Sequence, residues 1–60
     1  MLFKNGDHVI INTPDIDELN NLTGKIVGCS GLSYTVLFEN AQYNGWDAIT
    51  LPYWSLTKLE

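Results

Sequence analysis

Three carboxylates fall within four residues of this chain, at Asp15, Asp17 and Glu18. Such a cluster is able to bind calcium or to present negative charge to a basic partner. A calcium loop of the EF-hand kind has glycine at its sixth position and an acidic ligand at its twelfth, whereas counting from Asp15 gives Asn20 and Ile26. The calcium loop is therefore excluded. Two interpretations stay open: acids that favour the positive end of a short helical turn, and a docking surface for a protein with a basic surface.

The residue types used in catalysis and metal binding are sparse. His8 follows Asp7, but adjacent strand residues point to opposite faces, and a general base needs a nucleophile within reach. Cys29, Ser30 and Ser33 have no sequence context that marks an activated nucleophile. A metal site built from His8 and Cys29 would lack further ligands at a recognisable spacing. We therefore predict no enzyme, no metal site and no cofactor.

Four aromatic side chains lie in or beside predicted turns: Tyr43, Trp46, Tyr53 and Trp54. A domain of this size cannot bury all of them, and Trp and Tyr are enriched among the anchors of protein interfaces. One interpretation is that two or three of them cover the open end of the domain, and the other is that they bind a partner. Within the group, Tyr53 and Trp54 form the pair that we favour as a contact surface.

Composition restricts the class of protein. The 60 residues are 45% hydrophobic and 17% charged, which is typical of a globular chain with one thin core, and we expect a single domain over residues 1–60. Seven acidic residues oppose three lysines without any arginine, giving a net charge of −4. Because nucleic-acid affinity comes largely from Lys and Arg that neutralise phosphates, this balance argues against a nucleic-acid partner.

The sequence also constrains location. Cys29 is the single cysteine, so an intramolecular disulfide is impossible, whereas small secreted domains usually depend on such crosslinks. The first seven residues become polar too early for a signal peptide, and no run approaches the roughly 18 apolar residues of a membrane span. We expect a cytoplasmic protein with no membrane association.

Five short apolar runs must position these side chains, and they cover residues 8–11, 25–27, 34–38, 46–51 and 56–59. Their length, their alternation and the turn residues that end them predict five β-strands in a small, strongly bent barrel. The alternation is clearest over 34–38. We expect these strand side chains to face the core: Val9, Ile11, Ile26, Tyr34, Val36 and Phe38.

The connection over residues 13–23 is too polar for a strand. Thr13 is a residue type that caps helices, Pro14 suits a first helical position, and acids follow. This pattern predicts one helical turn inside the loop, with Ile16 and Leu19 on its buried side.

The other connections are predicted to be tight. Residues 28–31 read as a turn with glycine at both ends, and Asn44-Gly45 is the preferred pair for a two-residue type I′ hairpin between flanking aromatics. Pro52 ends the fourth strand, and residues 53–55 are predicted as a single 3₁₀ turn before the last strand.

The order of strand, long loop, strand, tight hairpin, strand, hairpin, strand, 3₁₀ turn and short strand resembles the SH3-like barrel. Residues 6–11 with 22–28 resemble the paired strands of KOW-type modules, and residues 34–38 with 43–45 resemble the middle of the photosystem I subunit IV family. Residues 51–59 are similar to the end of eukaryotic SH3 domains, where a proline opens the 3₁₀ turn. The resemblance implies an all-β, five-stranded SH3-like barrel.

Departures from these families limit the function that the resemblance implies. Residues 9–13 lack the aromatic cluster with which SH3 domains grip proline-rich peptides. Lys4, Lys25 and Lys58 stand alone where KOW modules carry many basic residues, and the basic positions of the photosystem family are missing too. Neither proline-rich peptides nor RNA are therefore expected as ligands.

The prediction that remains is a small non-catalytic module that binds a basic protein surface through its acidic loop and its exposed aromatics. Similar small SH3-like proteins are common among phage and mobile-element genes, so the resemblance implies a phage-encoded modulator or inhibitor of a host protein, acting in the host cytoplasm. The alternatives are a KOW-like nucleic-acid-binding module that stacks bases on its aromatics, and a subunit that only supports a larger assembly. The sequence leaves the partner's identity and the oligomeric state open.

Overall fold

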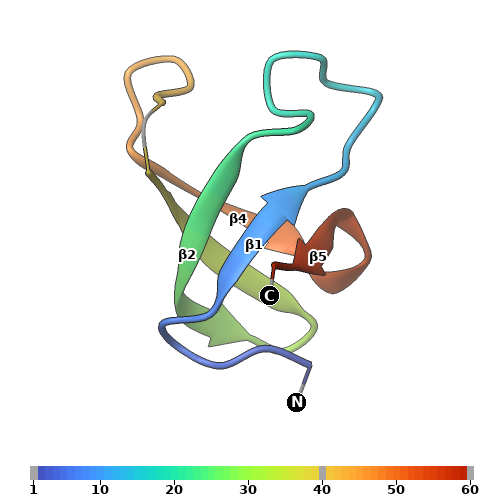
Figure 1. Cartoon of the computed structure of the whole chain (residues 1–60), viewed down its shortest axis with the longest axis vertical. Coiled ribbons are helices and arrows are strands. Elements are labelled where there is room, and N and C mark those ends of the chain that lie inside the picture. Colours follow the sequence, from blue (N-terminus) through green and yellow to red (C-terminus); the bar gives the residue numbers. More distant parts are fainter. Residues whose placement is uncertain (1, 40, 60) are drawn as a thin grey trace.

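The computed structural model describes residues 2–39 and 41–59, which form one antiparallel sheet with irregular connections (Figure 1). The elements are β1 His8–Ile11, β2 Thr23–Ser30, β3 Ser33–Phe38, β4 Ala48–Pro52, the 3₁₀ turn η1 Tyr53–Ser55 and β5 Leu56–Lys58. The prediction of an all-β chain with five strands and a 3₁₀ turn before the last strand is confirmed. Over these residues, no helix has the length and apolar character needed to cross a membrane.

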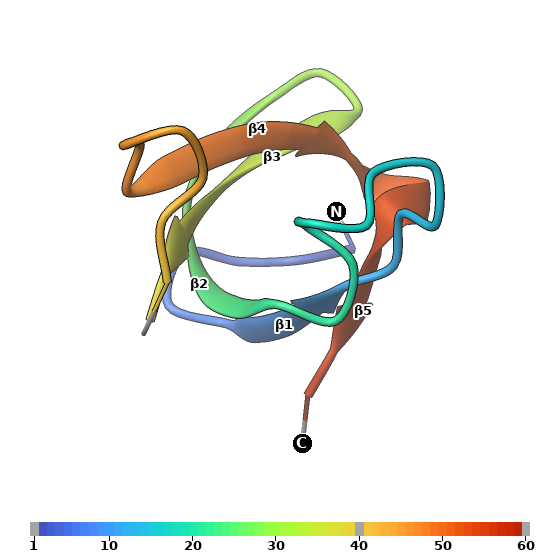
Figure 2. The ribbon, with the colours of Figure 1, turned by 90° about the horizontal axis from the view of Figure 1, so that it is seen from above.

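The strands are ordered β4-β3-β2-β1-β5, and every neighbouring pair is antiparallel. The sheet curls strongly, so that its strands surround a common interior (Figure 2). β4 and β5 form the two ends of the sheet and are not paired with each other. In the part of the chain that the structure describes, the sheet therefore has two edges, one on each terminal strand.

Alternation along the strands separates a buried face from an exposed one. Val36 is fully buried, and Tyr34 and Phe38 are nearly so, whereas Leu37 between them is 39% exposed. All the strand residues expected in the core are buried, and the loops add to them. The core consists of Phe3, Val9, Ile11, Leu19, Ile26, Tyr34, Val36, Phe38, Leu51 and Leu56.

β2 extends to Ser30, farther than predicted, because a β-bulge between Ile26 and Gly28 shifts its register with β3. Val27 is the extra residue of the bulge and is 44% exposed. One unpaired residue allows a strand to continue past small residues that otherwise read as a turn. The predicted turn is therefore wrong in its start: the chain reverses only at Gly31, whose φ is 60°.

The connection from β1 to β2 contains consecutive turns in place of the predicted helical turn. Leu19 N and Asn20 N both donate hydrogen bonds to Ile16 O, at 3.0 and 3.1 Å. Leu19 is fully buried, as expected, but Ile16 is 37% exposed, so its predicted burial is wrong. The physical reason is that the chain returns at once to the end of β1, where Asn21 N donates to Ile11 O at 2.8 Å, and no residues remain to continue a helix.

The two-residue turn between β3 and β4 is present as predicted. Asn44 and Gly45 have φ values of 52° and 80°, the left-handed conformations that a type I′ turn requires. Tyr43 and Trp46 face each other across it and exchange backbone hydrogen bonds of 3.0 and 2.8 Å. A bend then separates the turn from β4, which begins at Ala48 and not at the predicted Trp46.

Candidate functional site

η1 holds two aromatic side chains at the surface between β4 and β5. The turn follows Pro52, whose φ of −66° is the value that the proline ring imposes. Ser55 is only 9% exposed, and its carbonyl accepts a hydrogen bond from Asn12 N at 2.7 Å. With Ser55 directed inward, Tyr53 and Trp54 are 36% and 68% exposed. Their rings meet edge to face, with centroids 5.2 Å apart and an interplanar angle of 79°.

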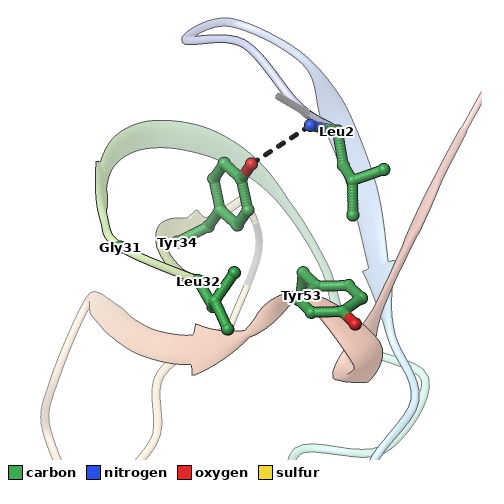
Figure 3. A pocket seen from close by; sticks show the side chains of 5 residues that line it. All are labelled: Leu2, Gly31, Leu32, Tyr34 and Tyr53. Atoms are coloured by element: carbon green, nitrogen blue, oxygen red, sulfur yellow. Dashed lines mark hydrogen bonds between the residues drawn. The ribbon is translucent and has the colours of Figure 1, made fainter.

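An apolar pocket of about 420 Å³ lies beside this turn. Figure 3 shows its walls: Leu2 from the N-terminal segment, Leu32 from the β2–β3 turn, and the rings of Tyr34 and Tyr53. Leu2 and Leu32 are 62% and 67% exposed. Tyr53 N donates to Leu32 O at 2.9 Å, which fixes these two walls relative to each other. The result is an open hollow in the surface whose walls suit an apolar side chain of a partner.

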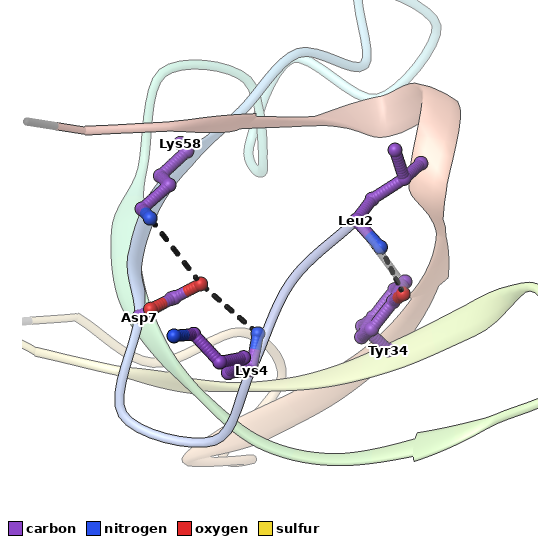
Figure 4. A network of polar contacts seen from close by, with 5 residues as sticks. All are labelled: Leu2, Lys4, Asp7, Tyr34 and Lys58. Atoms are coloured by element: carbon purple, nitrogen blue, oxygen red, sulfur yellow. Dashed lines mark hydrogen bonds and ion pairs between the residues drawn. The ribbon is translucent and has the colours of Figure 1, made fainter.

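A short polar network holds the N-terminal segment that supplies Leu2 (Figure 4). Leu2 N donates to the Tyr34 hydroxyl at 3.2 Å, and Lys4 N donates to Asp7 Oδ2 at 2.9 Å. Asp7 N donates in return to Lys4 O at 3.0 Å, and Lys58 Nζ lies 3.8 Å from Asp7 Oδ2. The network closes the chain into a tight loop before β1 and positions Leu2 at the pocket.

The three clustered acidic residues lie in the loop between β1 and β2. Asp15, Asp17 and Glu18 are all exposed, and the ion pairs found in residues 2–39 and 41–59 are formed by other side chains. The loop begins next to η1, as the hydrogen bond from Asn12 N to Ser55 O shows, and Figure 2 shows its first part beside that turn. The three carboxylates therefore present negative charge to solvent on a segment adjoining the exposed aromatics.

The other two aromatic residues singled out in the sequence lie elsewhere. Tyr43 is half-buried and packs against the core, so it covers the interior. Trp46 is 69% exposed in the β3–β4 hairpin, which both views place on the opposite side of the molecule from η1 (Figures 1 and 2). The structure thus brings Tyr53 and Trp54 near the acidic loop and separates Trp46 from them.

The side chains considered for catalysis or metal binding are dispersed. His8 Nε2 lies 3.3 Å from Glu39 Oε2 at the surface, and Cys29 is an exposed thiol on β2. Among the residues with described positions, His, Cys, Asp and Glu form no group of three that could hold a metal ion. What the arrangement offers chemically is an apolar hollow, two exposed rings and a negatively charged loop.

Sequence reasoning does not identify Leu2 or Leu32 as lining residues. One signal could have found Leu32, because it follows Gly31 at the tip of a hairpin, where polar residues are usual. Leu2 has no such signal. Its position depends on the Tyr34 hydroxyl, which belongs to a residue 32 positions away in the chain.

No protein-family model matches this chain, and no match is found among curated proteins or solved structures. The function is therefore argued from the geometry of the pocket, η1 and the acidic loop.

Proposed function

We propose that the protein is a small non-catalytic module that binds another protein through η1, the adjoining pocket and the acidic loop. The observation that carries the proposal is the position of Trp54, which is 68% exposed and stacked edge to face on Tyr53, a wall of the pocket. Trp and Tyr are strongly enriched among interface residues that dominate binding energy. The exposed indole of Trp54 offers a partner a contact surface, and the adjacent pocket can accept one of the partner's apolar side chains.

The scaffold that we propose for this module is an SH3-like barrel. Its support is the curled five-stranded antiparallel sheet, the long loop between β1 and β2, and the 3₁₀ turn directly before β5. Such a scaffold carries many different functions, so the partner has to be argued from the site.

The pocket and η1 supply the affinity in this proposal. A volume of about 420 Å³ lies within the roughly 300–1,000 Å³ typical of ligand-binding clefts and cavities. Its walls are mainly leucine and tyrosine, so the group that enters is an apolar or aromatic side chain of the partner. Truncation of a Trp or Tyr that is a hot spot at the centre of an interface costs about 2 kcal/mol or more of binding free energy.

The acidic loop supplies the preference for a basic partner. The chain carries a net charge of −4, and three of its acids lie together on this exposed loop. Exposed charges of this kind mainly orient and accelerate association, and salt screens them. The partner that fits is a protein with an apolar side chain flanked by Lys or Arg. We propose that it is a larger host protein, which a phage-encoded module modulates or inhibits by covering that surface.

Selection from a random-peptide display library tests this proposal. The immobilised wild-type protein should enrich peptides in which an apolar or aromatic residue neighbours Lys or Arg. A synthetic enriched peptide should bind Trp54→Ala about tenfold more weakly or worse. Combined replacement of Asp15 and Asp17 by Asn and of Glu18 by Gln should weaken binding at low salt and reduce its dependence on salt.

Trp46→Ala is the matched comparison, because Trp46 is 69% exposed but lies in the hairpin far from η1. Its peptide affinity should equal that of the wild type. An equal loss in Trp46→Ala and Trp54→Ala would contradict a site at η1, and unchanged binding after neutralisation of the loop would remove the acidic loop from the proposal. Salt-dependent binding of labelled single-stranded RNA, without peptide enrichment, would instead favour the nucleic-acid alternative.

A further inference from the structure

The free edge of β4 is the second surface with a definable ligand chemistry. β4 ends the sheet, and among the residues whose positions are described it pairs with β3 alone. Hydrogen bonds mark both ends of this pairing: Phe38 N donates to Asp47 O at 2.8 Å, and Tyr53 N donates to Leu32 O at 2.9 Å. These two bonds establish which backbone groups of β4 face β3.

Hydrogen-bonded and non-hydrogen-bonded pairs alternate along an antiparallel ladder. Counting in steps of two between the bonds at the ends gives Ile49 and Leu51 as the β4 residues that bond to β3. The alternation leaves Ala48 and Thr50 with their N–H and C=O groups directed away from β3. Over the part of the chain that the structure describes, no backbone hydrogen bond from a loop or turn satisfies these groups.

The two edges of the sheet differ in how they are protected. β5 has three residues and carries Lys58, and both shortness and an edge lysine hinder pairing with another strand. β4 has five residues without a charged side chain, and only its last residue, Pro52, lacks a donor. The β4 edge is therefore the one available for a further strand.

We propose that the β4 edge pairs with the β4 edge of a second copy of this chain, antiparallel about a twofold axis at Ile49. In this register Ala48 of each copy faces Thr50 of the other, so every N–H and C=O that these residues direct outward gains a partner. Antiparallel pairing of a strand with itself is the simplest symmetric use of one edge, since the same patch serves both copies.

The distribution of charge fits this register. Two chains of charge −4 repel each other, so like charges facing each other at the edge would oppose pairing. Asp47, the acid nearest β4, faces Leu51 of the second copy and not the other Asp47. Its carboxylate accepts a hydrogen bond from Gln42 Nε2 at 2.7 Å, within its own hairpin.

Strands of this length make a small interface, below the roughly 1,200–2,000 Å² of standard stable complexes. We therefore expect a weak dimer with a dissociation constant between about 1 μM and 1 mM. The residues that pair in this register, from Ala48 to Thr50, do not include η1 or the residues that line the pocket.

Sedimentation equilibrium of the wild-type protein, from low micromolar to about 1 mM, tests the proposal. The apparent mass should rise from that of one chain towards that of two. Thr50→Pro removes an outward N–H and keeps the backbone bonds to β3, although it also removes the hydrogen bond of 3.0 Å between the Thr50 and Thr35 hydroxyls. It should weaken association about tenfold or more. The matched control is Lys58→Pro, which alters the other edge: Leu59 N donates to His8 O, so the Lys58 N–H also points away from its neighbouring strand.

Circular dichroism establishes whether each variant is folded. If Thr50→Pro is not, Thr50→Lys takes its place, because it keeps the backbone and places a blocking charge at the edge. This change reduces the magnitude of the net charge from −4 to −3, which by itself would favour association, so a loss of association reports on the edge. A wild-type protein that stays monomeric at the highest concentration overturns the proposal. So does a dimer that Lys58→Pro weakens as much as the change at Thr50.

Discussion

Gly24 lies against Val36 so closely that a β-carbon on Gly24 would be 2.5 Å from Val36 Cγ1. The same β-carbon would lie 2.6 Å from the carbonyl oxygen of Leu37. The valine methyl could move aside, but the carbonyl belongs to the β2–β3 ladder and could yield only if the strands separated. Glycine at this position therefore permits the close approach of β2 and β3 on which the core depends.

Gly24→Ala should destabilise the domain by about 1–3 kcal/mol, as overpacking of a core usually does. Urea unfolding followed by circular dichroism measures the change. Gly28→Ala is the control, since its added methyl would meet Thr35 Cβ at an ordinary 3.8 Å and should cost much less. Similar losses in the two variants would contradict the close contact.

Leu19 anchors the acidic loop to the core. It is fully buried, although it lies outside every strand, whereas Ile16 in the same loop is 37% exposed. Leu19→Ala should cost about 2–5 kcal/mol, which is a large part of the stability of so small a domain. Ile16→Ala should cost far less. Thermal unfolding of both variants checks this, and equal losses would indicate the helical turn that buries both side chains.

The Asn44-Gly45 turn depends on backbone conformations that few residues adopt. Gly45 has a φ of 80°, which strains a residue that carries a β-carbon. Gly45→Ala should cost about 1 kcal/mol, and Gly45→Asn should cost less, because Asn tolerates the left-handed region better than Ala. A thermal melt of each variant measures the order, and an alanine variant as stable as wild type would contradict the type I′ geometry.

Sequence patterns over a few neighbouring residues predicted the strand over residues 34–38 and the turn at Asn44-Gly45, because both depend on local residue types. Residues 34–38 alternate without exception, and a half-buried strand is the structure that satisfies this alternation. Asn44-Gly45 was equally predictable, because the two residue types themselves favour the left-handed conformations of the turn.

Features that depend on contacts between distant residues could not be predicted in this way. Gly28 looks like the start of a turn until the bulge at Val27 is known, and that bulge exists only against β3. The pocket is a stronger example, since Leu2 and Leu32 become neighbours of Tyr53 only after the sheet has curled. Tyr53 and Trp54 were recognisable as aromatic residues in a turn, but the hollow beside them was not.

The Tyr34 hydroxyl links the core to the wall of the pocket, because it accepts a hydrogen bond from Leu2 N at 3.2 Å. Tyr34→Phe keeps the buried ring, which packs edge to face on Phe3 with centroids 5.0 Å apart, and removes only that acceptor. We expect a loss of about 0.5–1.5 kcal/mol in stability, and Leu2 methyl resonances that move towards their disordered values in NMR spectra. In Tyr53→Phe, by contrast, the Leu2 methyls should keep their order, since no hydrogen bond joins the Tyr53 hydroxyl to that segment among the described residues. Leu2 resonances that are unchanged in Tyr34→Phe would show that the wall of the pocket is held by apolar contacts alone.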